Sequence, residues 1–177
     1  MTVVATSWLE VALPLGIPGL FGVIAWWANG ARSERTRLQK LYADAFSAVV
    51  SYQEFPYVIR RRRAPLAGQD GIANEERLRI SEALQAVQEA LNNYRAQIST
   101  ESAAISVQYE ALVGKTRQIA GKEMHEAWEA PPLDNDAGMN IAHIDYTQLA
   151  EPEKHYLDAV KTDVTFGRIF FSGARPR

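Results

Sequence analysis

The sequence predicts an all-α protein with an N-terminal transmembrane helix, followed by a long-helix hairpin or bundle with coiled-coil character. Two features carry this prediction: an uncharged apolar run near the N-terminus, and apolar residues that recur at three- and four-residue steps afterwards. The 177 residues include no cysteine, which excludes a disulfide scaffold and a cysteine nucleophile. We expect a transmembrane segment over 1–30, a cytoplasmic helical domain over 31–166 and a tail over 167–177.

The anchor is expected within residues 11–28 (VALPLGIPGLFGVIAWWA), which carry no charge. As a helix this run spans about 27 Å, close to the roughly 30 Å of a bilayer's hydrocarbon core. Basic residues cluster only after the run, which favours a single-pass plasma-membrane protein with its N-terminus outside and its body in the cytoplasm. A signal peptide and a buried core hairpin are the alternatives. The expected anchor residues are Trp8, Pro14, Gly16, Pro18, Gly19, Gly22, Trp26 and Trp27.

The prolines and glycines make this run an unusual plain tether. Pro14 and Pro18 each remove a backbone donor, so the helix is expected to begin near one of them and to be short, tilted or re-entrant. Alternatively, the glycines form a close-packing face between copies, because small residues let helices approach in lipid.

The body shows helical periodicity throughout. A first amphipathic stripe runs over 38–52, and Pro56 is expected to kink or end that helix. A heptad seam follows, which we interpret as a self-association surface: Ile80, Leu84, Val87, Leu91, Tyr94 and Ile98.

The length of the helical run over 72–128 leaves two alternatives. A break near 99–102, with Ser or Thr as the cap, would fold the run into an antiparallel hairpin. The lack of Gly and Pro over 73–113 favours one long, kinked helix instead. Pro131 and Pro132 should stop the run, and a short helix is expected over 151–166.

Charge is distributed unevenly. Residues 32–63 carry eight basic and three acidic side chains, whereas residues 70–136 carry six basic and twelve acidic ones. Four consecutive arginines, Arg60, Arg61, Arg62 and Arg63, are candidates for binding an anionic partner. We rank pairing with the acidic helices first, an acidic partner protein or nucleotide second, and nucleic acid a distant third.

Catalytic signatures are weak. Gly114, Lys115 and Thr116 imitate the end of a phosphate-binding loop, but they lie inside a helical pattern and lack the motif's first glycine. The three histidines have no metal-ligand spacing, and residues 134–138 (DNDAG) fit a polar turn better than a calcium loop. We therefore expect no catalytic residue, no metal, no cofactor and no enzymatic activity.

Two segments also carry a resemblance. Residues 42–63 (YADAFSAVVSYQEFPYVIRRRR) and the later 127–132 (AWEAPP) resemble uncharacterised small bacterial membrane-anchored proteins with an E-[FL]-P-Y segment before arginines and a later A-W-x-x-P-P. The resemblance covers roughly 32–132 and implies a shared helical fold, with no activity to carry over.

Three functions fit these patterns. The first is a membrane-tethered, self-associating scaffold without catalytic activity, whose partners are the bilayer and further copies. The second is a membrane-perturbing or pore-forming effector that assembles through the N-terminal helix. The third is a soluble helical domain that binds a ligand.

Overall fold

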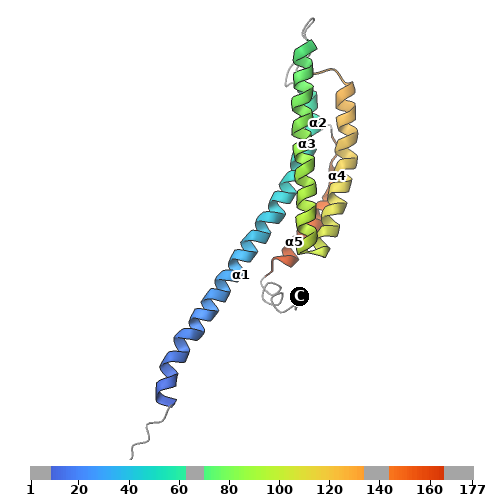
Figure 1. Cartoon of the computed structure of the whole chain (residues 1–177). Coiled ribbons are helices and arrows are strands. Elements are labelled where there is room, and N and C mark those ends of the chain that lie inside the picture. Colours follow the sequence, from blue (N-terminus) through green and yellow to red (C-terminus); the bar gives the residue numbers. More distant parts are fainter. Residues whose placement is uncertain (1–8, 63–69, 134–143, 166–177) are drawn as a thin grey trace, which may run out of the picture. The chain divides into compact units, whose positions relative to one another are not determined.

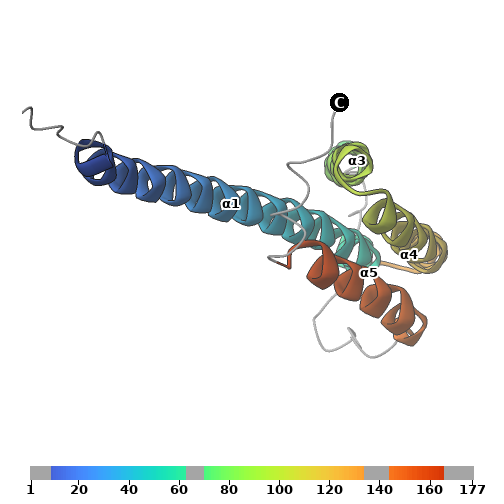
Figure 2. The ribbon, with the colours of Figure 1, turned by 90° about the horizontal axis from the view of Figure 1, so that it is seen from below.

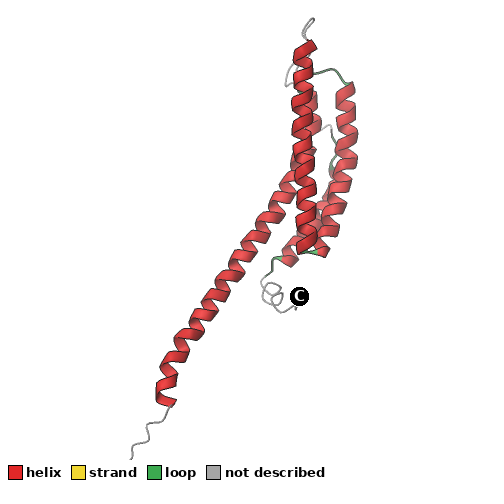
Figure 3. Ribbon diagram, viewed as in Figure 1, coloured by secondary structure: helices red, strands yellow, loops and turns green. Residues whose placement is uncertain are grey.

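The computed structural model describes residues 9–62, 70–133 and 144–165, and at 9–28, 31, 70, 72 and 73 it describes the backbone alone. The elements are α1 (Leu9–Gln53), α2 (Phe55–Arg60), α3 (Asp70–Glu101), α4 (Ala103–Glu129), the 3-10 turn η3 (Thr147–Leu149) and α5 (Ala150–Asp163). None of the described residues lies in a β-strand (Figure 3), so the all-α prediction is confirmed.

The chain divides into two compact units. One contains residues 1–38 with 164–177, and the other contains residues 39–163. The expected boundaries at residues 30 and 166 stay predictions, as does the role of the tail 167–177, which lies outside the described residues.

Helix α1 passes through both N-terminal prolines. It begins at Leu9, so the expectation that a helix starts near Pro14 or Pro18 is wrong. Each proline removes a single backbone donor, and the i→i−4 bonds on either side can carry the helix past it. Among the helices whose side chains are described, none is long and apolar enough to cross a membrane. The expected transmembrane run 11–28 is not among those side chains.

The other end of α1 follows the sequence closely. The helix ends at Gln53, and Pro56 lies in the first turn of α2. Proline suits that position because its missing N–H has no partner at a helix start. The prediction that Pro56 ends the first amphipathic helix is confirmed.

Helices α3 and α4 form an antiparallel hairpin and run side by side in Figure 1. The single residue between them, Ser102, has an extended backbone (φ −151°, ψ 112°), so the expectation of one long helix over 72–128 is wrong. Ser102 stands at the N-cap of α4, yet its side chain forms no capping hydrogen bond, and its buried Oγ has no partner. The extended backbone of Ser102 therefore makes the break without a side-chain cap.

Helix α4 is the centre of the unit 39–163. It packs against α3, α5 and α2, and Figure 2 shows it between α3 and α5. The largest fully buried side chains of this bundle include Tyr42 and Val49 from α1, Ile59 from α2, and residues of α3, α4, η3 and α5: Ile80, Leu91, Ile98, Ile105, Tyr109, Leu112, Thr116, Leu149 and Tyr156.

Tyrosines tie α1, α4 and α5 together inside the bundle. The hydroxyl of Tyr156 donates to the carbonyl oxygen of Tyr42 at 2.8 Å, and its ring stacks on Phe46. The Tyr109 ring meets the Tyr156 ring at a tilt, with 5.7 Å between centroids. These aromatic side chains fill the core while their hydroxyls reach polar partners, as buried tyrosines usually do.

The last helices end and begin as expected. Helix α4 stops at Glu129, and Ala130 adopts an extended backbone because the following proline disfavours the helical region. Helix α5 falls within the predicted range 151–166 except for its first residue.

Candidate functional site

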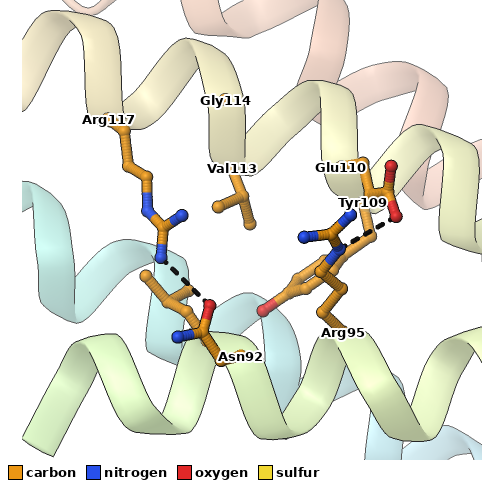
Figure 4. Close-up of a pocket in the computed structure, with 8 residues that line it drawn as sticks. Asn92, Arg95, Tyr109, Glu110, Val113, Gly114 and Arg117 are labelled. Atoms are coloured by element: carbon orange, nitrogen blue, oxygen red, sulfur yellow. Dashed lines mark hydrogen bonds and ion pairs between the residues drawn. The ribbon is translucent and has the colours of Figure 1, made fainter.

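A hollow of about 230 Å³ opens between α3 and α4, midway along the hairpin. Figure 4 shows the side chains around it: α3 contributes one wall and α4 the other. It is lined by Leu91, Asn92, Arg95, Tyr109, Glu110, Val113, Gly114 and Arg117.

Gly114 lines the hollow from α4 without a side chain. A Cβ atom built at Gly114 would meet no other atom within 4 Å, so any larger residue there would project into open space. Leu91 and the Tyr109 ring are buried beside it, and Val113 points into the gap in Figure 4. Val113, with the almost fully buried Leu91 and Tyr109 beside it, therefore gives the hollow a small apolar floor.

Two guanidinium groups stand at the rim, one from each helix. Arg117 of α4 donates to Oδ1 of Asn92 at 3.3 Å, and Arg95 of α3 donates through Nε to Oε1 of Glu110 at 2.9 Å. A guanidinium carries five N–H donors, so each arginine keeps donors beyond these bonds. The Arg95 side chain is 59% exposed, which leaves its head accessible from solvent.

The phenol of Tyr109 closes the inner side of the hollow. Burial raises the pKa of Tyr109 well above its ordinary value, which keeps the phenol neutral. Its hydroxyl has only a long hydrogen bond of 3.5 Å to the carbonyl oxygen of Ala45. The inner wall is therefore a neutral aromatic ring beneath two cationic groups.

Arg62, from the predicted arginine cluster, binds inside the protein. Its guanidinium donates to the carbonyl oxygens of Ala127 (2.7 Å), Trp128 (3.1 Å) and Ala130 (2.6 Å), and it lies over the Trp128 ring, 5.1 Å from the centroid. These oxygens include the free acceptors at the C-terminus of α4, where the helix dipole favours a cation. Burial lowers the pKa of Arg62, with a smaller contribution from Arg77.

The structure describes three of the four arginines, and their surroundings differ. Arg61 is exposed, Arg60 is half-buried and Arg62 is occupied, while Arg63 lies outside the described residues. The interpretation that placed intramolecular pairing first had the wrong partner for Arg62, since backbone carbonyls take the place of acidic side chains. The other arginines as an anionic-partner site stay a prediction.

The heptad seam is used within the chain. Ile80, Leu91 and Ile98 are buried in the bundle itself, so a second copy cannot reach them without opening the hairpin. Leu84, Val87 and Tyr94 are only half-buried. Three of the six predicted seam residues are therefore accessible to a second copy, and self-association through the seam stays a prediction.

The predicted anchor residues lie outside the described side chains. Trp8 lies outside the described residues altogether. For the others only the helical backbone is described: Pro14, Gly16, Pro18, Gly19, Gly22, Trp26 and Trp27.

Known proteins offer no guide to this site. No family model, curated protein or solved structure matches the chain. Within the described residues, no group of three or more His, Cys, Asp or Glu side chains is placed to hold a metal ion.

The sequence did not predict the hollow, although Leu91 belongs to the predicted seam and Gly114 to the rejected phosphate-loop triplet. Asn92, Arg95 and Arg117 look like ordinary solvent-facing helix residues in the sequence. The available signal was Gly114, because a glycine in a helix interior costs stability and often has a packing or functional reason.

Proposed function

We propose that this protein is a membrane-tethered helical interaction protein that self-associates and has no catalytic activity. The observation that carries the proposal is a helical bundle whose central helix, α4, is covered on several sides, while the long helix α3 keeps part of its apolar seam accessible. The polar side chains described in the bundle join its helices: the Tyr156 hydroxyl donates to the backbone of α1, and Arg62 donates to carbonyl oxygens at the end of α4. Both contacts serve packing.

The tether is proposed from the sequence of α1. This helix contains both the apolar run 11–28 and the first helix of the bundle, over 39–53. Two of the basic residues after the run have helical neighbours as partners: Arg37 pairs with Glu34, and Lys40 pairs with Asp44. These exposed pairs leave the expected orientation of α1 in the membrane unchanged, because the positive-inside rule counts Lys and Arg rather than net charge.

Self-association is proposed through the accessible part of the seam. Leu84 and Val87 lie one turn apart on α3 and are half-buried in the single chain. A second copy that covers them would bury further apolar area, at about 25 cal/mol for each Å² removed from water. This gain is modest, so membrane tethering, which concentrates the copies, would help the association.

Light scattering on the full chain in detergent tests the proposal. We expect an oligomer whose mass falls towards one copy in the double variant Leu84→Asp, Val87→Asp. The matched control is Val107→Asp, which changes an exposed residue (63%) of α4 and should leave the mass unchanged. Circular dichroism on each variant checks that the helices persist. A single copy at every concentration of the unaltered chain would contradict self-association.

A bilayer-perturbing effector is the weaker proposal. Pro14, Pro18 and the glycines of the run 11–28 motivate it, and α1 is continuous through both prolines, which leaves the glycines as its main support. Dye release from liposomes that depends on residues 11–28 would restore it.

A further inference from the structure

We propose that the hollow between α3 and α4 binds a small organic anion with a flat apolar body, such as an aromatic carboxylate. The body would rest on Val113, next to the buried Leu91 and Tyr109, and the charged group would lie between Arg95 and Arg117. This inference is independent of membrane tethering and self-association.

The volume sets the size of the ligand. An apolar cavity of about 150 Å³ accommodates benzene, so the 230 Å³ between α3 and α4 has room for one ring with one charged substituent. Drug-sized ligands usually occupy roughly 300–1,000 Å³, so a larger molecule would extend into solvent.

The charges around the hollow predict that the ligand is an anion. Arg95 and Arg117 approach the hollow from opposite helices, and Glu110 is the one acidic side chain that lines it. The lining therefore carries a net positive charge next to an apolar floor. Planar guanidinium groups suit carboxylates because they can donate two parallel hydrogen bonds.

Glu110 is expected to weaken binding. Its carboxylate accepts from Nε of Arg95 at 2.9 Å and competes with an incoming anion for that guanidinium. Glu110→Gln would remove the competing charge without changing the shape of the side chain. Tighter binding in this variant would distinguish a true anion site from a surface on which a ring merely adheres.

Calorimetric titration of the full chain in detergent provides the test, with benzoate as the probe. Benzyl alcohol, which is neutral, and acetate, which lacks the ring, separate the apolar contribution from the charge. We expect benzoate to bind most tightly of the three. Arg95→Gln and Arg117→Gln should each weaken benzoate binding about tenfold and leave benzyl alcohol unaffected.

Gly114→Leu should abolish binding by filling the hollow. The matched control is Gly121→Leu, two turns further along α4, where an added Cβ also meets no atom within 4 Å but which does not line the hollow. Because neither site is crowded, both variants should fold. Benzoate binding that survives Gly114→Leu, or that is unchanged in both arginine variants, would overturn the proposal. Acetate binding as tightly as benzoate would overturn the role of the apolar floor.

Discussion

The hydroxyl of Tyr42 donates a hydrogen bond of 2.9 Å to Oδ2 of Asp163, and both side chains are buried. This contact joins α1 to the last residue of α5, 121 positions away in the chain. A buried carboxylate that loses a hydrogen-bond donor retains the cost of leaving water, so the contact matters more when broken than its net strength suggests.

Tyr42→Phe should therefore lower the free energy of unfolding by about 1–3 kcal/mol. Urea denaturation of the full chain in detergent measures the change. Tyr52→Phe is the control, because the Tyr52 ring is buried while its hydroxyl forms no hydrogen bond with the residues that the structure describes. If Tyr42→Phe and Tyr52→Phe lowered the free energy of unfolding equally, the Tyr42–Asp163 hydrogen bond would not stabilise the fold.

Arg62→Lys should destabilise the end of α4, although it keeps the charge. A lysine ammonium cannot reproduce the fork that reaches the oxygens of Ala127, Trp128 and Ala130 while lying over an indole ring. We expect a loss of about 2 kcal/mol in the free energy of unfolding, since hydrogen bonds to charged groups contribute roughly 1.5–3 kcal/mol. Hydrogen exchange should accelerate at the amides of the last turn of α4.

The neighbouring Arg61→Lys serves as the control for this effect. Arg61 is exposed, and an exchange of one cation for another there should change the free energy of unfolding by less than about 0.5 kcal/mol. If Arg62→Lys and Arg61→Lys had the same small effect, the hydrogen bonds from Arg62 to the end of α4 would not contribute to stability.

Alkaline pH should unfold the bundle. Burial raises the pKa of Tyr109 and of Tyr156, whereas the same phenols in an unfolded chain titrate near about 10. Above that pH the unfolded chain binds fewer protons than the folded one, so the free energy of unfolding falls as pH rises. The contribution of these tyrosines is complete below about pH 9 and is lost progressively above about pH 10.

Denaturation midpoints measured between about pH 8 and pH 11 would check this dependence. Tyr156→Phe should lower stability at every pH and make the alkaline decline shallower, because one titrating phenol is removed. An identical slope in the variant would show that Tyr156 does not contribute to the pH dependence.

The helical architecture was predictable because its signals are local. Pro56, and Pro131 with Pro132, act on the backbone around them, and the structure ends a helix at each place. The break at Ser102 was not predictable in the same way. Ile98 and Ile105 keep a seven-residue spacing across it, so the apolar repeat continues while the chain reverses. A heptad pattern records which residues are buried but not which helix covers them.

The candidate site was harder to predict for a related reason. Arg62 binds carbonyl oxygens at the end of α4, and every residue type supplies such an oxygen, so no sequence pattern marks the partner. The hollow beside Gly114 depends on the pairing of α3 with α4, which the sequence left undecided. Charge counting found an arginine-rich segment but could not tell that Arg62 turns inward.

Ser102→Ala should leave stability unchanged or raise it. If Ser102 capped α4 through its side chain, the substitution would cost about 0.5–2 kcal/mol. Its Oγ is buried without a hydrogen-bond partner, so alanine removes a polar atom that lost its hydration on folding. Urea denaturation would show the sign directly. Ser102→Pro, by contrast, should be destabilising: Ser102 N donates to the carbonyl oxygen of Ile98 at 2.9 Å, and the extended φ of −151° lies far from the proline value. A cost of 1 kcal/mol or more for Ser102→Ala would contradict the uncapped junction, because it would mean that the hydroxyl stabilises the turn.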